Sequence, residues 1–454
     1  MSCKTNRSRG YATATILIVV AILGSTALWS YREVLTGRTL ANARFFQVRA
    51  ASLAGIGLQA AASELRRQPA VTRLAWQQQA PGARDEQIGI STRLLRTETL
   101  PAGFSADRFL DYQHELTSTV SSGLGTQVAR SMGVALLNAR VGNAPPPGCP
   151  TAEPVPINVR IGGSSTAPVA AMLTTGSPTL GIVDRSTGRL LWSAGGPDAP
   201  TAQHLFDDRT HITGSVTVID TDSDGLHDRI YAGDHAGRIW RLDLHNGSDG
   251  AHFAAGSIFA ELADARVPRP FVAAPDVSMT IGTAGLAWLN IVIGSTGAGP
   301  NRIFVLRDYA ARQLWSDAEH QRWRPLRAAD LHADGPAADV AEPAGYYFDL
   351  GQSQVFTPSI TVDGAATYLA AETAIRVANG CNTRISIGKF NVASGASAAR
   401  HAYGDAAAGI ALRALAGGTP HRGRIRCMLA DDEVAQCSGF DPLRRSWWRR
   451  ADAD

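Results

Sequence analysis

Four aspartates at a fixed spacing separate two strand-like segments near the middle of the chain. They follow the pattern D-x-D-x-D-G-x-x-D and are Asp220, Asp222, Asp224 and Asp228. Carboxylates held this close repel one another by several kcal/mol at an effective dielectric constant of about 20. A folded loop of this composition usually holds a cation, and the sequence predicts Ca²⁺.

The spacing of these residues suits a calcium loop of nine residues. Alternate side chains of a tight loop point inward, so the first three aspartates supply oxygens at positions 1, 3 and 5, and Gly225 permits the sharp turn. Leu226 offers its backbone carbonyl, and Asp228 closes the loop at position 9. An EF-hand needs Glu at position 12, where Tyr231 stands, and strand patterns replace the helices. The alternative interpretation is a solvated acidic hairpin turn.

The segment VIDTDSDGLHDRIYAGDHAGRIWRLDL, residues 218–244, resembles a strand pair of a known family. It is similar to the calcium-binding strands in the C-terminal β-propeller of the type IV pilus tip-adhesin and assembly family, the PilY family. The IYAGD and G-x-I-W-R-L-D runs carry the similarity together with the loop. The resemblance implies that the four aspartates and the Leu226 carbonyl bind Ca²⁺, and that calcium controls pilus extension against retraction.

A loose repeat surrounds the acidic loop between residues 157 and 443. Strand-like runs with polar turns recur at spacings of about sixty residues or more, wider than the roughly 40 to 50 of propeller blades, and two of them end in Leu-Trp-Ser. With the resemblance, they predict an all-β, quinoprotein-like β-propeller, complete or incomplete, in which Trp192 and Trp315 wedge between sheets. The alternative is a β-sandwich with both tryptophans in its core.

The N-terminal segment predicts a transmembrane helix. Residues 11–29 carry no charge and as a helix would extend about 28 Å, and basic residues precede them, which predicts a cytoplasmic N-terminus. Arg9-Gly10-Tyr11 resembles the leader of a prepilin, residues 1–10, cleaved between Gly10 and Tyr11. Thr15 replaces the usual Glu, as in minor pilins of the PilX type. A secretory signal peptide is the rival interpretation.

The sequence after this run predicts a small pilin. An alanine-rich apolar pattern without proline continues the helix, giving a long helix over residues 11–68. Residues 69–143 contain two strand-like pieces around Ser121-Ser122-Gly123 and resemble a PilX-like minor pilin head. The predicted fold is thus an α+β pilin-like segment with one long N-terminal transmembrane helix. The alternative is a simple single-span anchor with a juxtamembrane helix.

Proline and cysteine mark the remaining boundaries. Residues 144–156 form a proline-rich linker, which predicts an extended, semi-rigid connection. Four cysteines follow the leader, and an even number in an exported chain suggests disulfides: Cys427 with Cys437, and Cys149 with Cys381, although other pairings stay open. Residues 444–454 are a basic tail with two tryptophans, expected to be solvated or to touch anionic lipid or polysaccharide.

No sequence pattern indicates an enzyme. GSTGAG at residues 294–299 lacks the Lys-Ser/Thr of a P-loop, and neither H-E-x-x-H nor G-x-S-x-G occurs. A quinone-dependent dehydrogenase shares the propeller pattern, but no vicinal cysteine pair is present. A net charge of +3 over 454 residues gives no reason to expect a nucleic-acid partner.

These patterns together predict a type IV pilus biogenesis or tip component that displays a calcium-binding β-propeller. Its expected role is adhesion or control of pilus extension and retraction. Expected partners are other minor pilins, pilus assembly proteins, the inner membrane and a host or abiotic surface. We expect inner-membrane anchorage with periplasmic or extracellular C-terminal domains, and the pilus tip or cell surface after assembly. The alternative is a membrane-tethered periplasmic scaffold or quinoprotein-like protein that does not enter a pilus.

Overall fold

The computed structural model divides the chain into two compact units. Unit 1 comprises Met1–Arg93, His114–Val134 and Arg445–Asp454, and unit 2 comprises Leu94–Gln113 and Ala135–Arg444. The domain boundaries expected from the sequence stay predictions. The structure describes residues 8 to 451 except 69, 82–85, 123–126, 140–153, 164–165, 177–178, 196–202, 205, 207–209, 211, 213–215, 264–268, 283–284, 298–299, 338–339, 341, 356–358, 374–382, 406–411, 417–424, 430–431 and 434–442.

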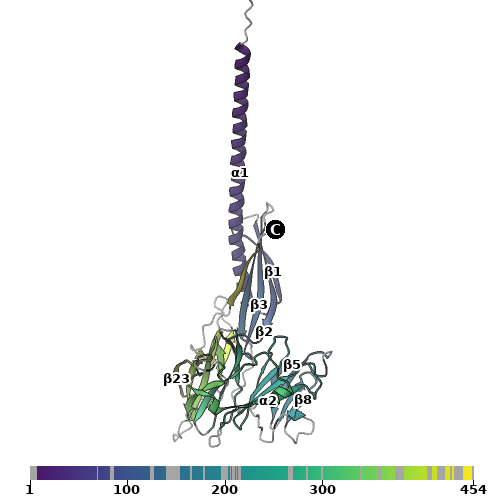
Figure 1. Cartoon of the computed structure of the whole chain (residues 1–454), viewed down its shortest axis with the longest axis vertical. Coiled ribbons are helices and arrows are strands. Elements are labelled where there is room, and N and C mark those ends of the chain that lie inside the picture. Colours follow the sequence, from purple (N-terminus) through teal and green to yellow (C-terminus); the bar gives the residue numbers. More distant parts are fainter. Residues whose placement is uncertain are drawn as a thin grey trace, which may run out of the picture. The chain divides into compact units, whose positions relative to one another are not determined.

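Unit 1 contains the long helix α1, Ser8–Leu65 (Figure 1). The helix runs this far because proline is absent and alanine is frequent over its whole length. Its last turns bury small and apolar residues three or four positions apart, including Ala54, Leu58 and Ala61. A side chain at Gly57 would clash with the Ser118 hydroxyl, so the helix backbone approaches the sheet closely there.

The sheet beside this helix combines strands from both ends of the chain. Its order is β1-β2-β3-β4-β27. The bounds are Arg73–Gln79 for β1, Glu86–Glu98 for β2, Phe109–Ser122 for β3, Gln127–Ala139 for β4 and Leu443–Ala451 for β27. Strand β27 contains most of the basic segment that was predicted to be a tail. Its backbone forms an edge strand of this sheet.

The remaining described strands form five sheets. Their orders are β5-β6-β7-β8-β9, β10-β11-β12-β13-β17, β14-β15-β16-β19-β18, β20-β21-β22-β23 and β24-β25-β26. The bounds are β5 Val155–Val159, β6 Val169–Gly176, β7 Thr179–Asp184, β8 Leu190–Gly195, β9 Gln203–His204, β10 Val216–Ile219, β11 Arg229–Gly233, β12 Arg238–Leu244, β13 Ala254–Glu261, β14 Asp276–Ile281, β15 Ala287–Gly294, β16 Asn301–Asp308, α2 Asp317–Arg322, β17 Leu326–Arg327, the 3-10 helix Ala328–Asp330, β18 His332–Ala333, β19 Gly345–Gly351, β20 Ile360–Val362, β21 Ala365–Thr373, β22 Thr383–Asn391, β23 Ser397–Asp405, β24 Leu412–Ala416, β25 Ile425–Leu429 and β26 Asp432–Glu433.

The prediction of a quinoprotein-like β-propeller is wrong for the residues that the structure describes. The strands form separate open sheets of three to five strands rather than a closed ring. Three of these sheets end in a two-stranded parallel pairing with a very short strand: β8 with β9, β13 with β17, and β19 with β18. Each short strand covers the edge of its own sheet, and it does not link that sheet to the next one in a ring.

The prediction of a transmembrane helix over residues 11–29 is also corrected. Within the described part of the chain, no helix combines the length and the apolar character that crossing a bilayer requires. From residue 32 onward, charged residues recur along α1 and interrupt its apolar stretches: Arg32, Glu33, Arg38, Arg44 and Arg49. The described chain is mostly β, with α1, α2 and one 3-10 turn as its helices.

The core of unit 2 lies around strands that are buried on both faces. Every residue of β10, β11 and β12 is buried, including the charged residues Arg229, Arg238, Arg241 and Asp243. Trp192 and Trp315 are both buried, in two different hydrophobic clusters. The acidic loop is therefore set between two strands whose positions are fixed by packing.

Candidate metal centre

The acidic loop connects the antiparallel strands β10 and β11. Val216 pairs with Ala232 and Ile219 pairs with Arg229, so the two strands bring the ends of the loop together. The Asp228 amide donates a hydrogen bond to the Ile219 carbonyl at 2.9 Å and closes the loop. The strand patterns read from the sequence on both sides of the loop agree with these elements.

Three of the predicted ligands converge. Asp220, Asp222 and Asp224 place one carboxylate oxygen each within 4.8 Å of one another. Asp220 is buried, whereas Asp222 and Asp224 are exposed. The arrangement is a half-open site with one carboxylate at its base and two at its rim.

Backbone amides of the loop orient these carboxylates. Asp220 accepts hydrogen bonds from the Ser223 amide at 2.7 Å and the Gly225 amide at 2.9 Å, one on each oxygen. Asp222 accepts from the Asp224 amide at 3.0 Å, and Asp224 from the Leu226 amide at 2.7 Å. Because each carboxylate retains lone pairs beyond these bonds, it can still contribute an oxygen to a cation.

Two residues of the loop have left-handed backbone conformations. Gly225 has a φ of +91°, which matches the sharp turn expected from its position. Ser223 has a φ of +67°, a conformation that is uncommon for a residue with a side chain. Contacts with the surrounding structure must therefore stabilise Ser223 in this conformation.

Asp228 lies beside the cluster but uses one oxygen for the protein itself. Its Oδ2 accepts hydrogen bonds from the Thr221 amide at 2.7 Å and the Thr221 hydroxyl at 2.9 Å. Its Oδ1 lies 3.4 Å from the Asn246 side-chain amide. Leu226 is buried. The roles of Asp228 and of the Leu226 carbonyl as calcium ligands stay predictions.

The two buried carboxylates of the loop, Asp220 and Asp228, have raised pKa values. Burial raises the pKa of Asp228 to about 6, and repulsion by Asp222 and Asp220 adds to the rise against the hydrogen bonds from Thr221. Burial also raises the pKa of Asp220, with smaller contributions from Asp224 and Asp222. A divalent cation would relieve both the desolvation and the repulsion.

The donor set fits calcium. All converging atoms are hard carboxylate oxygens, which Ca²⁺ prefers at about 2.3–2.6 Å. Two oxygens bound to one ion at that distance lie at most about 5 Å apart, and the three carboxylate oxygens lie within 4.8 Å of one another. Neither a thiolate nor an imidazole belongs to the described cluster, so the chemistry of its donors suits calcium better than zinc.

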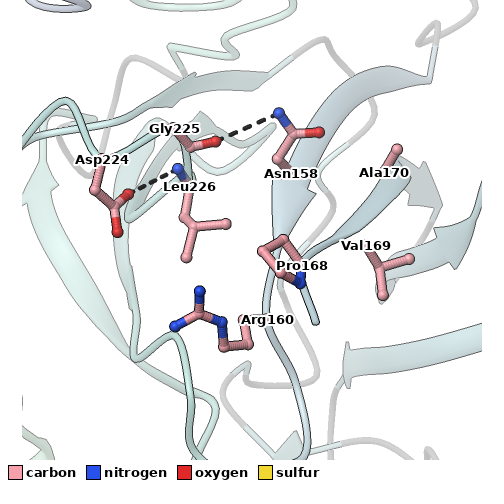
Figure 2. Close-up of a pocket in the computed structure, with 8 residues that line it drawn as sticks. All are labelled: Asn158, Arg160, Pro168, Val169, Ala170, Asp224, Gly225 and Leu226. Carbon is pink, nitrogen blue, oxygen red and sulfur yellow. Dashed lines mark hydrogen bonds between the residues drawn. The ribbon is translucent and has the colours of Figure 1, made fainter. Parts of the chain in front are cut away.

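The outer side of the loop is tied to β5 and borders a pocket. The Asn158 side chain donates to the Gly225 carbonyl at 3.3 Å, and the His227 amide donates to the Asn158 carbonyl at 2.9 Å. A pocket with a volume of about 360 Å³ lies between this strand and the loop. Figure 2 shows the residues that line it. Its lining residues are Asn158, Arg160, Pro168, Val169, Ala170, Asp224, Gly225 and Leu226.

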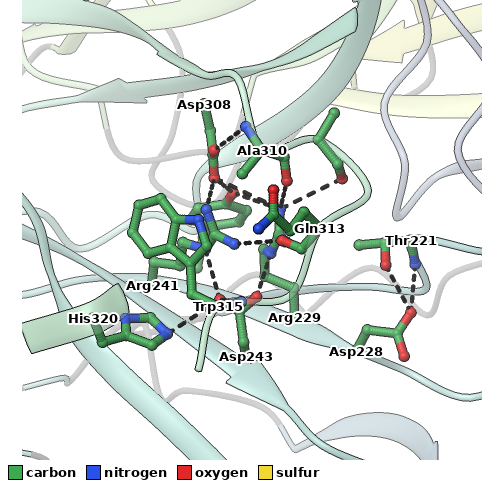
Figure 3. A network of polar contacts seen from close by, with 12 residues as sticks. Thr221, Asp228, Arg229, Arg241, Asp243, Asp308, Ala310, Gln313, Trp315 and His320 are labelled. Carbon is green, nitrogen blue, oxygen red and sulfur yellow. Dashed lines mark hydrogen bonds and ion pairs between the residues drawn. The ribbon is translucent and has the colours of Figure 1, made fainter. Parts of the chain in front are cut away.

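A buried ionic network begins directly after the loop (Figure 3). Asp243 accepts hydrogen bonds from the Arg229 side chain at 2.6 Å and the Arg241 side chain at 2.9 Å. Arg241 also donates to Asp308 at 2.7 Å and stacks over the Trp315 ring at 3.6 Å. The two arginines are fully buried, so the network anchors the strand that leaves the loop.

Sequence reasoning missed this network, although the sequence contains a signal for it. Arg229, Arg241 and Asp243 interrupt runs that otherwise read as fully buried strands. Charges in such runs are rarely left unpaired in a folded core, so they indicate partners elsewhere in the chain.

The leader cleavage site and the disulfides stay predictions. Gly10 and Tyr11 lie in α1, and cleavage between them stays a prediction. Cys149, Cys381 and Cys437 lie outside the described residues, and Cys427 is on β25 with its side chain undescribed. The predicted disulfides therefore stay predictions.

Comparison with solved structures shows a structural similarity, whereas comparison with family models and curated proteins gives none. No protein-family model matches the chain, and no curated protein matches it. The chain is similar to the crystal structure of the Pseudomonas aeruginosa PilY1 C-terminal domain, with 12% identity and a TM-score of 0.44. The match covers 84% of this chain and 86% of that chain. At this TM-score the similarity carries no argument about function.

Proposed function

We propose that the protein is a non-enzymatic component of a type IV pilus system whose β-rich unit 2 binds calcium in the loop of residues 220–228. The observation that carries the calcium part is the convergence of Asp220, Asp222 and Asp224 within 4.8 Å. The raised pKa of Asp228 supports it, because a carboxylate buried beside like charges is stabilised by a cation.

The pilus part of the proposal rests on the resemblance of residues 218–244 to the calcium strand pair of the PilY family. The proposed role is adhesion or the control of extension and retraction, with pilus assembly proteins as partners. The proposed location is the cell surface or the pilus. In this role calcium neutralises the loop, and the buried network after Asp228 keeps β11 and β12 rigid behind it.

Calcium affinity tests the first part. We expect the purified full chain to bind one Ca²⁺ in isothermal titration calorimetry. The double variant Asp222→Asn, Asp224→Asn removes two ligand charges, which set calcium affinity, so we expect a fall of about a hundredfold. Both residues are exposed, so the fold is retained.

Asp249→Asn is the matched control for this measurement. Asp249 is also an exposed turn aspartate, and it accepts hydrogen bonds from the Ala251 amide at 3.1 Å and the His252 amide at 3.0 Å. This variant should bind calcium as the wild type does. Equal affinity in the double variant and the wild type would rule out the loop as the site.

Pilus fractionation tests the second part. We expect antibody to detect the protein in pili sheared from cells of the native bacterium. Detection only in cell envelopes that lack sheared pili would favour the alternative of a periplasmic scaffold, and it would leave the calcium result untouched.

A further inference from the structure

The segment of residues 94–113 is separated from the metal loop by more than a hundred residues of sequence, yet it belongs to unit 2. It contains the end of β2, the start of β3 and the turn between them. Ala102 forms a β-bridge with Met279, and Ser105 forms one with Ser278. Leu100 is fully buried in the same hydrophobic cluster as Ile219, the residue that precedes the loop. The segment is therefore paired with β14 and shares a hydrophobic cluster with the strand that leads into the loop.

Glu98 and Thr99 of this segment bind the loop directly. The Thr99 amide donates to the Ser223 hydroxyl at 3.1 Å. The Thr99 hydroxyl donates to the Asp220 carbonyl at 2.8 Å. The Ser223 hydroxyl donates in turn to Glu98 Oε1 at 3.2 Å. Glu98 and Thr99 thus contact the loop at its first and fourth residues.

Arg312 completes the contact from another side. Its guanidinium donates to Glu98 Oε1 at 3.2 Å and to the Thr221 carbonyl at 3.3 Å. The Glu98 side chain is only 13% exposed, so Arg312 balances a largely desolvated charge beside the loop. The loop backbone is consequently held at Asp220, Thr221 and Ser223 by groups that are not themselves in the metal cluster.

The geometry of Ser223 shows what these contacts do. Its φ of +67° is unfavourable for a residue with a side chain. In this conformation its amide reaches Asp220 Oδ1 at 2.7 Å and orients the buried carboxylate. The hydroxyl contacts with Glu98 and Thr99 hold Ser223 in place, so the carboxylate is oriented before an ion arrives.

We propose that Glu98 and Thr99 are positioning residues for the calcium loop, and that calcium occupancy is coupled to the order of residues 94–113. This inference rests on the proposed calcium function. The coupling is reciprocal by thermodynamic necessity: if the contact strengthens calcium binding, calcium strengthens the contact by the same factor.

Thr99→Val tests the inference in the full-length chain. The variant removes the hydroxyl that binds the Asp220 carbonyl and keeps the side-chain shape. Loss of an outer partner typically lowers metal affinity by about 10–100-fold, and we expect a fall of about tenfold in calorimetry with Ca²⁺. Thr99→Ser keeps the hydroxyl and should restore wild-type affinity.

Thr296→Val is the control for a purely structural effect. Thr296 is also half-buried, and its hydroxyl donates to a backbone carbonyl, that of Pro270, at 3.1 Å. Its loss should lower the melting temperature about as much as Thr99→Val does in calcium-free buffer, and calcium affinity should stay unchanged.

Hydrogen exchange gives a second measurement of the coupling. In the wild type, calcium should slow exchange in a peptide covering residues 94–105, relative to the protein in chelator. In Thr99→Val this protection should fall. If Thr99→Val does not fold, Ser223→Ala provides the test, because it removes the contacts of the loop hydroxyl with Thr99 and Glu98.

The possible results separate the inference from the proposed function. Equal calcium affinity in wild type, Thr99→Val and Ser223→Ala would overturn the inference and leave the calcium site intact. Absence of calcium binding in the wild type would overturn the proposed function and, with it, the inference. A tenfold loss in Thr99→Val with none in Thr296→Val and Thr99→Ser would support it.

Discussion

Asp243→Ala is expected to lower the free energy of unfolding by about 3–5 kcal/mol, because removal of one partner leaves buried charges unpaired. Asp243 accepts hydrogen bonds from Arg229 at 2.6 Å and Arg241 at 2.9 Å, and both arginines are fully buried. It also accepts from the Trp315 amide at 3.1 Å. Urea unfolding monitored by circular dichroism measures the loss.

Asp349→Ala is the matched control for this large effect. Asp349 pairs with Arg302 at 2.7 Å, but its side chain is 59% exposed. An exposed pair contributes about 0–1 kcal/mol, since water screens it. Similar losses for the two variants would show that the Asp243 network is not buried as described.

The pH dependence of the Asp243 contribution has a definite sign. Burial raises the pKa of Asp243, but the charge of Arg229, the hydrogen bond from His320 and the charge of Arg241 outweigh it and hold this pKa well below the ordinary value. The stabilisation is therefore fully present above the ordinary carboxyl range and is lost as the pH falls toward the lowered pKa. The wild type should lose stability in acid more steeply than Asp243→Ala does.

Asp276→Asn is expected to raise the free energy of unfolding near pH 7 by up to about 3 kcal/mol. Burial, with repulsion by Asp107, raises the pKa of Asp276 from 3.8 to about 6. The folded wild type thus binds the proton more tightly than the unfolded chain does, so its stability falls as the pH rises from about 4 to about 6. Asn removes this ionisation and the dependence that follows from it.

Asn at this position can keep the hydrogen bond from Thr361. Asp276 Oδ2 accepts a hydrogen bond from the Thr361 hydroxyl at 2.6 Å, which an amide oxygen also accepts. Urea unfolding at pH 5 and pH 7.5 compares the variant with the wild type. A variant less stable than the wild type at both pH values would contradict the raised pKa.

The sequence alone predicted the acidic loop and the strands that flank it. Asp220, Asp222, Asp224 and Gly225 lie within six residues, and each one's role depends on a neighbour a few positions away. The strands β10 and β11 are likewise short and adjacent in sequence. Local spacing suffices for such a site because a hairpin closes it without help from distant segments.

The arrangement of the sheets could not be predicted in the same way. Apolar alternation and turns predict strands, but the same strands fit a closed ring, a sandwich or separate open sheets. The choice depends on edge pairings such as that of β13 with β17, across more than sixty residues. The expected transmembrane helix over residues 11–29 was wrong for another reason: absence of charge does not by itself give a helix the apolar character that crossing a bilayer requires, and no described helix has it.

The tertiary structure alone decided what holds the loop from outside. Glu98 and Thr99 contact Ser223, although more than a hundred residues of sequence separate them from it. The Arg229 side chain donates hydrogen bonds to the backbone carbonyls of Gln313 and Ala310. Carbonyl acceptors have no sequence signature, because every residue carries one. The sequence therefore determined which side chains can bind the ion, and the fold determined how firmly they are held, because that depends on contacts that form only when distant segments pack together.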